Sequence, residues 1–159
     1  MSRTIVDVGY YFEGYSKLRL FCFPTEVSME SLPSSCNTPL QKIETVDIDL
    51  DNGAEEYKAK YVVLKVTLED GAFKYIVRAR KKAAYHRDVS GPVSQDLLEK
   101  FGVRCEVCGG GRVLVNVSSK KILVFGYSVD FGQADHSMTV AAIKELLPKW
   151  NITYSNDGY

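Results

Sequence analysis

The chain has 159 residues with 20 basic and 20 acidic side chains, and 45% of its residues are hydrophobic. This length and composition fit one compact domain and exclude global disorder. Because the net charge is zero, the chain lacks the basic field of a bulk nucleic-acid binder, and we expect no nucleic-acid partner. The longest apolar runs, such as residues 61–64, are too short to span a membrane, so we expect no membrane association.

The first part of the chain is predicted to differ from the rest. Residues 1–41 are expected to form an N-terminal extension that is partly flexible, because residues 23–40 are rich in Ser, Pro, Thr and Asn. The chain begins without the apolar run of a signal peptide, and its early acidic residues argue against a mitochondrial presequence. Its cysteines are too few for a disulfide-stapled domain, so a reducing, cytoplasmic location is expected. These cysteines are Cys22, Cys36, Cys105 and Cys108.

An organised domain is predicted over residues 42–159, and it opens with strands. Residues 46–50 alternate apolar and acidic side chains, which is the period of a half-buried edge strand. Residues 60–68 are β-branched and apolar, as in a central strand. Residues 73–80 alternate again, and the turn-forming residues between these two segments predict that they form a hairpin.

A helix is predicted to follow, because apolar residues recur every four positions from Val89 to Phe101. Pro92 is tolerated only near the first turn, so the helix is expected to begin there. Gly102 occupies the position of a C-terminal cap. A second helix is predicted before Pro148, with Ser137 or Thr139 as its N-cap.

Short strands are predicted between the two helices and after the second helix. Their bounds are 104–108, 113–117, 122–127 and 152–155. Strands followed by a helix, strands, a helix and a strand indicate an α/β domain of the α+β type, with helices packed on a sheet. We expect a single domain with a mixed, mostly antiparallel sheet of about six strands and two flanking helices.

Two motifs of metal, redox or nucleotide sites are not supported by this sequence. Cys105 and Cys108 form a CxxC motif, but a zinc site needs more ligands, and a redox motif normally opens a helix. We therefore interpret them as structural cysteines. No GxxxxGK[ST] loop occurs, so ATP binding in that mode is unsupported.

Three places remain where phosphate chemistry is plausible. Residues 109–112 combine three glycines with an arginine, which suits an oxyanion, although a tight connection between strands explains them equally well. Ser128 follows a strand and precedes a helix, where a phosphate loop or an ordinary loop would fit. His86 follows a basic cluster and suits proton transfer, whereas a structural role is the alternative. His136 is interpreted as a capping or packing residue.

Several short segments occur in a characteristic order along the chain. They are Lys60-Tyr61-Val62-Val63-Leu64, Ile76-Val77-Arg78, Tyr85-His86-Arg87-Asp88, Cys105-Glu106-Val107-Cys108-Gly109-Gly110-Gly111-Arg112, Lys120-Lys121-Ile122, Gly126-Tyr127-Ser128, Phe131-Gly132-Gln133-Ala134-Asp135-His136 and Asn156-Asp157-Gly158-Tyr159. Taken in this order, the segments resemble the phosphohistidine phosphatase (Janus) family from about Val46 to the last residue. The first forty or so residues have no counterpart in that resemblance.

The resemblance implies an enzyme that hydrolyses the P–N bond of phosphohistidine, and also of phospholysine, in other proteins. It implies no metal, no cofactor and no covalent cysteine intermediate, with phosphohistidine-containing proteins as partners and a monomeric state. The general base of the family falls on His86. Its substrate and phosphate-binding residues fall on Lys60, Arg78, Tyr85, Arg112, Tyr127, Ser128, Val129 and Asp130.

Some positions depart from the pattern of the family. Asp130 stands where a small apolar residue is common, Lys82 where a tryptophan is usual, and Ala84 where an acid is usual. Gly91 and Pro92 alter the first turn of the helix after His86. These departures bear on substrate preference and activity. The alternative prediction is therefore a catalytically weak or inactive module that binds phosphate or phosphoproteins on the same fold.

Overall fold

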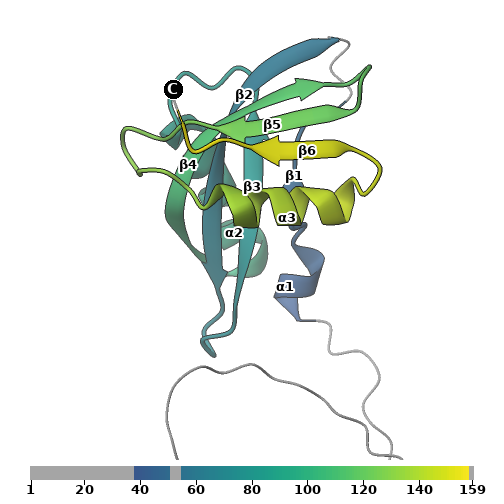
Figure 1. Ribbon diagram of the computed structural model, residues 1–159. Helices are drawn as coiled ribbons and strands as arrows, with labels where there is room; N and C mark the ends of the chain where they lie inside the picture. Colours follow the sequence, from purple (N-terminus) through teal and green to yellow (C-terminus); the bar gives the residue numbers. More distant parts are fainter. Residues whose placement is uncertain (1–37, 51–54, 158–159) are drawn as a thin grey trace, which may run out of the picture. The chain divides into compact units, whose positions relative to one another are not determined.

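A six-stranded sheet forms the centre of the fold in the computed structural model, which describes residues 38–50 and 55–157 (Figure 1). These residues lie within one unit, Cys36–Tyr159. The elements are α1 (Pro39–Lys42), β1 (Val46–Asp47), β2 (Glu56–Thr67), β3 (Phe73–Arg80), α2 (Arg87–Phe101), β4 (Arg104–Asn116), β5 (Lys121–Phe125), α3 (His136–Leu146) and β6 (Asn151–Tyr154). The predicted extension, apart from residues 38–41, lies outside the described residues, as do Cys22 and Cys36.

The sheet is mixed, in the order β1-β3-β2-β4-β5-β6. Its four inner strands pair antiparallel, whereas β1 and β6 run parallel to their neighbours at the two edges. The predicted hairpin is confirmed by the antiparallel pairing of β2 with β3. Gly71 adopts φ +86° in its turn, a conformation that favours glycine. The predicted α+β class is therefore confirmed, with the short helix α1 as a third helix.

The prediction of separate strands on either side of the glycines is wrong, because β4 runs without a break through residues 109–111. A Cβ atom on Gly110 would lie 2.7 Å from the Tyr61 carbonyl oxygen, and one on Gly111 would lie 2.7 Å from that of Phe125. The glycines therefore let neighbouring chain segments approach closely. A register shift between Val63 and Leu64 of β2 adds a bulge at the same place in β4.

Both predicted helix starts are also wrong. Helix α2 begins at Arg87 and contains Pro92, because burial of Val89 (1% exposed) fixes the preceding turn in the core. Proline removes one backbone donor there, and tertiary packing outweighs that cost. Helix α3 is capped by Asp135, whose carboxylate accepts a hydrogen bond from the Met138 amide at 3.1 Å. The predicted cap at Gly102 is confirmed, with φ +65°.

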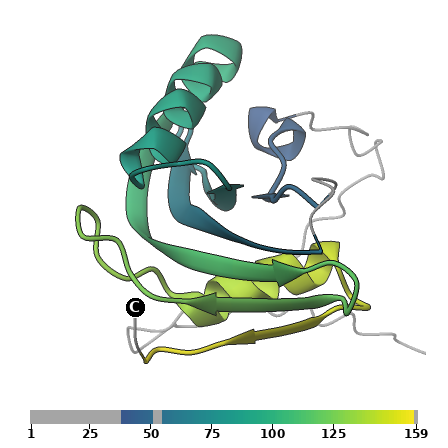
Figure 2. The same cartoon turned by 90° about the horizontal axis from the view of Figure 1, so that it is seen from above.

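The two long helices cover opposite faces of the sheet, because burial along β2 alternates between two cores. Tyr61 and Val63 pack with residues of α3, whereas Val62 and Leu64 pack with residues of α2. The sheet curls strongly along β2 and β4 (Figure 2). This curl and the helix positions bring the residues before α2 close to the glycines of β4.

Candidate functional site

His86 lies directly before α2 and is buried, with 4% of its surface exposed. Its Nε2 atom lies 2.9 Å from the carbonyl oxygen of Gly111. A carbonyl oxygen can only accept a hydrogen bond, so Nε2 carries the hydrogen. In the neutral ring, Nδ1 is then the nitrogen that can take a proton. The backbone of β4 thus sets the tautomer required of a base.

Ser128 lies in the loop between β5 and α3 and is almost completely buried, at 1% exposed. Its backbone is paired twice with Gly132, at 3.1 and 2.9 Å, which closes a tight turn. The Ser128 hydroxyl accepts a hydrogen bond from the Phe131 amide at 3.2 Å. The Gly110 amide donates to the Gly132 carbonyl at 3.1 Å, so the loop is fixed directly on β4.

Gly110 is the place where His86 and Ser128 meet. A Cβ atom added there would lie 2.9 Å from Cδ2 of His86 and 3.3 Å from Cβ of Ser128. No real side chain fits between these groups at such distances. The structure therefore places the buried side chains of His86 and Ser128, from two distant parts of the chain, close to one glycine.

Lys60 and Arg112 form a directly opposed pair on β2 and β4, two residues along from the pair of Val62 and Gly110. Two residues of a strand span roughly 7 Å, and side chains two residues apart point to the same face. The side chains of Lys60 and Arg112 therefore emerge near Gly110 on the same face of the sheet. The Lys60 ammonium donates to the Ala83 carbonyl at 3.1 Å. Two cations are thus carried within roughly 7 Å of Gly110 along the strands, and such cations can neutralise phosphate oxygens.

The remaining predicted residues of this region lie at the surface. Tyr127 is 44% exposed and Val129 is 80% exposed, and Asp130 is also exposed. Tyr85 is 57% exposed, and the Arg87 guanidinium lies 4.8 Å from the centre of its ring. These residues form the rim of the site rather than its interior.

Arg78 is not brought into this cluster. Its guanidinium donates to the carbonyl oxygens of Glu44 and Val77, each at 2.8 Å, and lies toward β1. Strand β2 separates β3, which carries Arg78, from β4. Burial away from water lowers the pKa of this arginine, because desolvation disfavours its charged form. In the structure Arg78 ties the segment before β1 to the sheet.

His136 is a packing residue, as predicted. It is buried at 2% exposed, and its Nδ1 atom lies 2.5 Å from the Tyr61 hydroxyl. Its Nε2 atom lies 3.0 Å from the Gly126 carbonyl oxygen. Because that oxygen can only accept a hydrogen bond, Nε2 is the donor. Burial lowers its pKa, so the neutral ring is the form that the fold favours.

Sequence reasoning missed the contributions of Gly110 and Gly111 to this site. It interpreted the glycines as a phosphate cradle or a connection, whereas they provide space for His86 and an acceptor for its Nε2 atom. The run of three glycines was the available signal. The contacts themselves depend on the positions of α2 and of the 126–132 loop relative to β4, and sequence spacing does not predict these positions.

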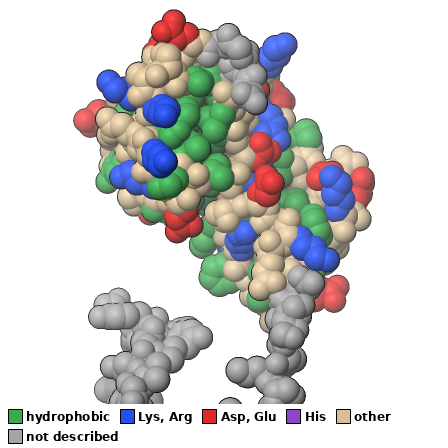
Figure 3. All heavy atoms as spheres, turned by 90° about the vertical axis from the view of Figure 1, so that its right-hand side faces the viewer, with side chains coloured by type: hydrophobic (Ala, Val, Ile, Leu, Met, Phe, Trp, Pro, Cys, Tyr) green, Lys and Arg blue, Asp and Glu red, His purple; other side chains and the backbone are tan. Residues whose placement is uncertain are grey.

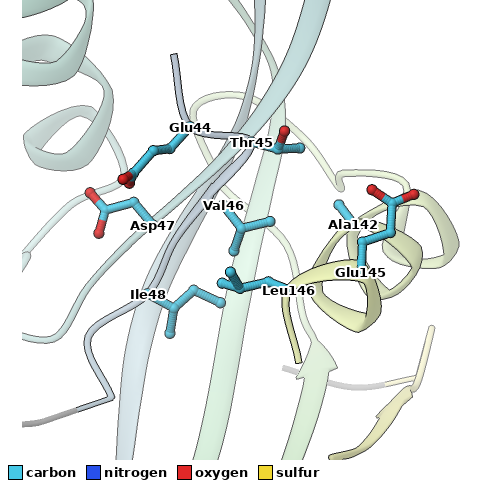
Figure 4. A pocket seen from close by; sticks show the side chains of 8 residues that line it. All are labelled: Glu44, Thr45, Val46, Asp47, Ile48, Ala142, Glu145 and Leu146. Carbon is cyan, nitrogen blue, oxygen red and sulfur yellow. The ribbon is translucent and has the colours of Figure 1, made fainter. Parts of the chain in front are cut away.

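Away from the residues around Gly110, a hollow of about 460 Å³ lies between β1 and α3 (Figure 4). Val46, Ile48 and Leu146 converge in it, while Glu44, Asp47 and Glu145 line its edges. Three carboxylates would repel a phosphate, so this hollow does not suit a phosphoryl substrate.

Among the described residues, no second cluster of reactive side chains stands out at the surface. Figure 3 shows hydrophobic side chains gathered among lysines, arginines and acids on one face, where neither histidine is visible. Within residues 38–50 and 55–157, no group of three or more His, Cys, Asp or Glu side chains could hold a metal ion. Cys105 and Cys108 are both free thiols. Among the described helices, none is long and apolar enough to cross a membrane.

Comparison with known proteins identifies relatives of the whole described domain. The Janus/Ocnus family model matches residues 40–151. A human 14 kDa phosphohistidine phosphatase is 40% identical over 126 residues, covering 76% of this chain and 96% of that protein. The pig 14 kDa phosphohistidine phosphatase is 39% identical over 126 residues, covering 76% and 95%. The sex-regulated protein janus-A of Drosophila melanogaster is 34% identical over 100 residues, covering 63% and 73%.

Proposed function

The chain belongs to the Janus/Ocnus family, and from this membership we propose that it is a protein phosphohistidine phosphatase that works without a metal ion. The observation that supports the proposal most directly is the meeting of His86 and Ser128 at Gly110. Phosphoproteins carrying phosphohistidine would be its substrates, with phospholysine as a second phosphoramidate. We further propose that it acts as a monomer in the cytoplasm.

His86 is proposed as the general base. Water attacks phosphorus while Nδ1 of His86 takes one of its protons, the P–N bond breaks, and the leaving nitrogen acquires a proton from solvent. The products are inorganic phosphate and the free histidine of the substrate. One positioned base typically contributes about 10²–10⁴-fold in rate. The hydrogen bond to Gly111 keeps the ring in the required tautomer during this step.

Charge on the three phosphoryl oxygens would be stabilised by groups from separate strands and the loop. Ser128 offers a hydroxyl, and Lys60 and Arg112 offer two cations close to Gly110. The exposed rim residues Tyr127, Val129 and Asp130 would border the bound group. Because these fixed cations are already present, the proposed reaction needs no metal to balance the charge.

A second candidate is a weak or inactive phosphoprotein-binding module. Asp130 favours it, because an exposed carboxylate on the Ser128 loop repels a phosphate nearby. The buried placement of His86 favours the enzyme instead, since binding alone does not require a base held in one tautomer.

The experiment that separates these candidates measures phosphate release from a phosphohistidine-bearing peptide in the presence of EDTA. We expect the parent protein to release phosphate, and His86→Ala to lose about 10²-fold or more of that rate. Lys144→Gln, on the exposed side of α3, serves as the control and should match the parent. Equal release by His86→Ala and the parent would refute the role of His86, and no release by the parent would favour the binding module.

A further inference from the structure

A small pocket with a strongly cationic lining adjoins the proposed phosphoryl site. Its volume is about 100 Å³, and it is lined by Lys58, Lys60, Lys81, Arg112 and two alanines. Lys60 and Arg112 are shared with the phosphoryl site, whereas Lys58 and Lys81 have no role in the proposed hydrolysis. No acidic side chain lines this pocket among the residues that the structure describes.

The position of the pocket follows from the register of β2 and β4. Lys58 and Lys60 lie on one face of β2, opposite Leu114 and Arg112 of β4. Each step of two residues moves roughly 7 Å along the strand, so the pocket lies about 7–14 Å from Gly110. An extended peptide advances about 3.3–3.6 Å per residue. A side chain two to four positions from a bound phosphohistidine would therefore reach the pocket.

Lys60 and Lys81 of this pocket are held in place by contacts with uncharged groups. The Lys81 ammonium lies 5.3 Å from the centre of the Tyr57 ring, and Tyr57 is itself buried at 5% exposed. In the part of the chain that the structure covers, the ion pairs are Arg80 with Asp47 and Lys100 with Asp96, and neither includes Lys58, Lys60 or Lys81. Like charges gathered in a small volume repel one another, and a bound anion relieves that repulsion.

Two acids belong to a neighbouring hollow that Lys81 also lines. Asp49 and Asp88 line a space of about 800 Å³ together with Arg80, Lys81 and Lys82. The Asp88 carboxylate there accepts a hydrogen bond from the Tyr85 amide at 2.7 Å. Lys81 therefore faces both spaces, and the acids do not fill the pocket that Lys58 and Lys60 line.

We propose that this pocket binds a carboxylate of the protein substrate, so that the site selects phosphohistidine located within an acidic segment. The inference rests on the proposed function for the identity of the reacting group. Lys58 and Lys81 are then specificity-determining residues. They act on the binding of the flanking chain and not on the hydrolysis itself, because Lys58 lies beyond Lys60 and Arg112 from Gly110 and Lys81 lines the same pocket.

The test compares two phosphohistidine peptides that differ only in Glu or Gln at the positions two to four residues from the phosphohistidine. We expect the parent protein to show a lower KM for the Glu peptide, by about two- to five-fold for each cation engaged, and the preference to shrink as salt rises. The double variant Lys58→Gln/Lys81→Gln should lose the preference with kcat retained. Lys144→Gln removes one lysine charge from the other face of the sheet, and this variant should keep the preference for the Glu peptide.

A small phosphoramidate without flanking residues separates the possible outcomes. If the double variant hydrolyses it as well as the parent does, the two lysines serve the flanking chain, as proposed. If its KM for the small substrate rises as much as for the Glu peptide, the pocket holds the reacting phosphoryl group, and the inference is overturned. Equal KM values of the parent for both peptides would also overturn it.

Failure of the proposed function would be visible separately, as no turnover of any substrate by the parent protein. In that case the pocket is tested by fluorescence anisotropy with labelled Glu and Gln peptides that carry no phosphate. Tighter binding of the Glu peptide by the parent, lost in Lys58→Gln/Lys81→Gln, would support the carboxylate site. Equal binding of both peptides would overturn it.

Discussion

Replacing Gly110 by alanine tests the central geometric feature of the site. The added Cβ atom would lie 2.7 Å from the Tyr61 carbonyl oxygen and 2.9 Å from Cδ2 of His86, whereas ordinary contacts begin at 3.4 Å. The imidazole would have to retreat by about 0.5 Å, and the backbone of the central strand β2 by about 0.7 Å. The first movement stretches the hydrogen bond between His86 and Gly111, which is 2.9 Å long.

Both consequences are measurable. Overpacking of this kind costs about 1–3 kcal/mol in the free energy of unfolding. A misplacement of about an ångström near reacting groups costs about 10²-fold in rate, so we expect Gly110→Ala to lower kcat/KM by about ten- to a hundred-fold. Urea unfolding and phosphate release from a small phosphoramidate, at a temperature where the variant is folded, give the two values separately.

Gly91→Ala provides the matched control, because it makes the same substitution in α2, a few residues after His86. A Cβ atom at Gly91 meets nothing within 4 Å. We expect it to stabilise the protein by about 0.4–1 kcal/mol and to leave kcat/KM unchanged. A Gly110→Ala protein with the stability and kcat/KM of the parent would refute the reasoning, since it would show that His86 and Ser128 do not need the space that the glycine leaves.

Two further outcomes are expected. Ser128→Ala should lower kcat by about 10²–10³-fold, because it removes one donor to the phosphoryl oxygens, and a decrease below three-fold in a phosphate-release assay would contradict that role. Burial lowers the pKa of His136 below its ordinary 6.5, so the unfolded chain binds more protons there and the free energy of unfolding falls as pH drops below about 6.5. His136→Gln should flatten this dependence between pH 7.5 and 5 in urea unfolding, and an unchanged slope would argue against it.

Local patterns in the sequence predicted the hairpin and the C-terminal cap well, but not the buried face of residues 73–80, where Phe73 and Tyr75 are exposed and Arg78 is buried. The hairpin turn at Gly71 and the cap at Gly102 depend on near neighbours, so the sequence alone reveals them. The wrong predictions concern residues whose surroundings come from elsewhere in the chain. The glycines 109–111 continue a strand because of contacts with β2, β5 and His86, and Asp135 caps α3 by one hydrogen bond.

The candidate site could be predicted only in part. Residue patterns indicated His86, Ser128 and Arg112 as separate candidates, and the resemblance to a family added Lys60 and joined the four in one site, since no spacing links a histidine before α2 to a serine after β5. The structure brings these four close to one another, but directs the guanidinium of Arg78 toward β1. The acceptor for His86 is a main-chain atom, and residue types carry no information about such an atom.

That main-chain acceptor has a genetic consequence. In sites where a carboxylate orients the histidine, a single codon change can delete the orienting group. Here the orienting atom is the carbonyl oxygen of residue 111, which every amino acid possesses. No substitution can remove it, and only those that displace the backbone, as a larger residue at position 110 or 111 would, can take it out of reach. Divergence among related chains is therefore constrained at this point by residue volume rather than by chemical type.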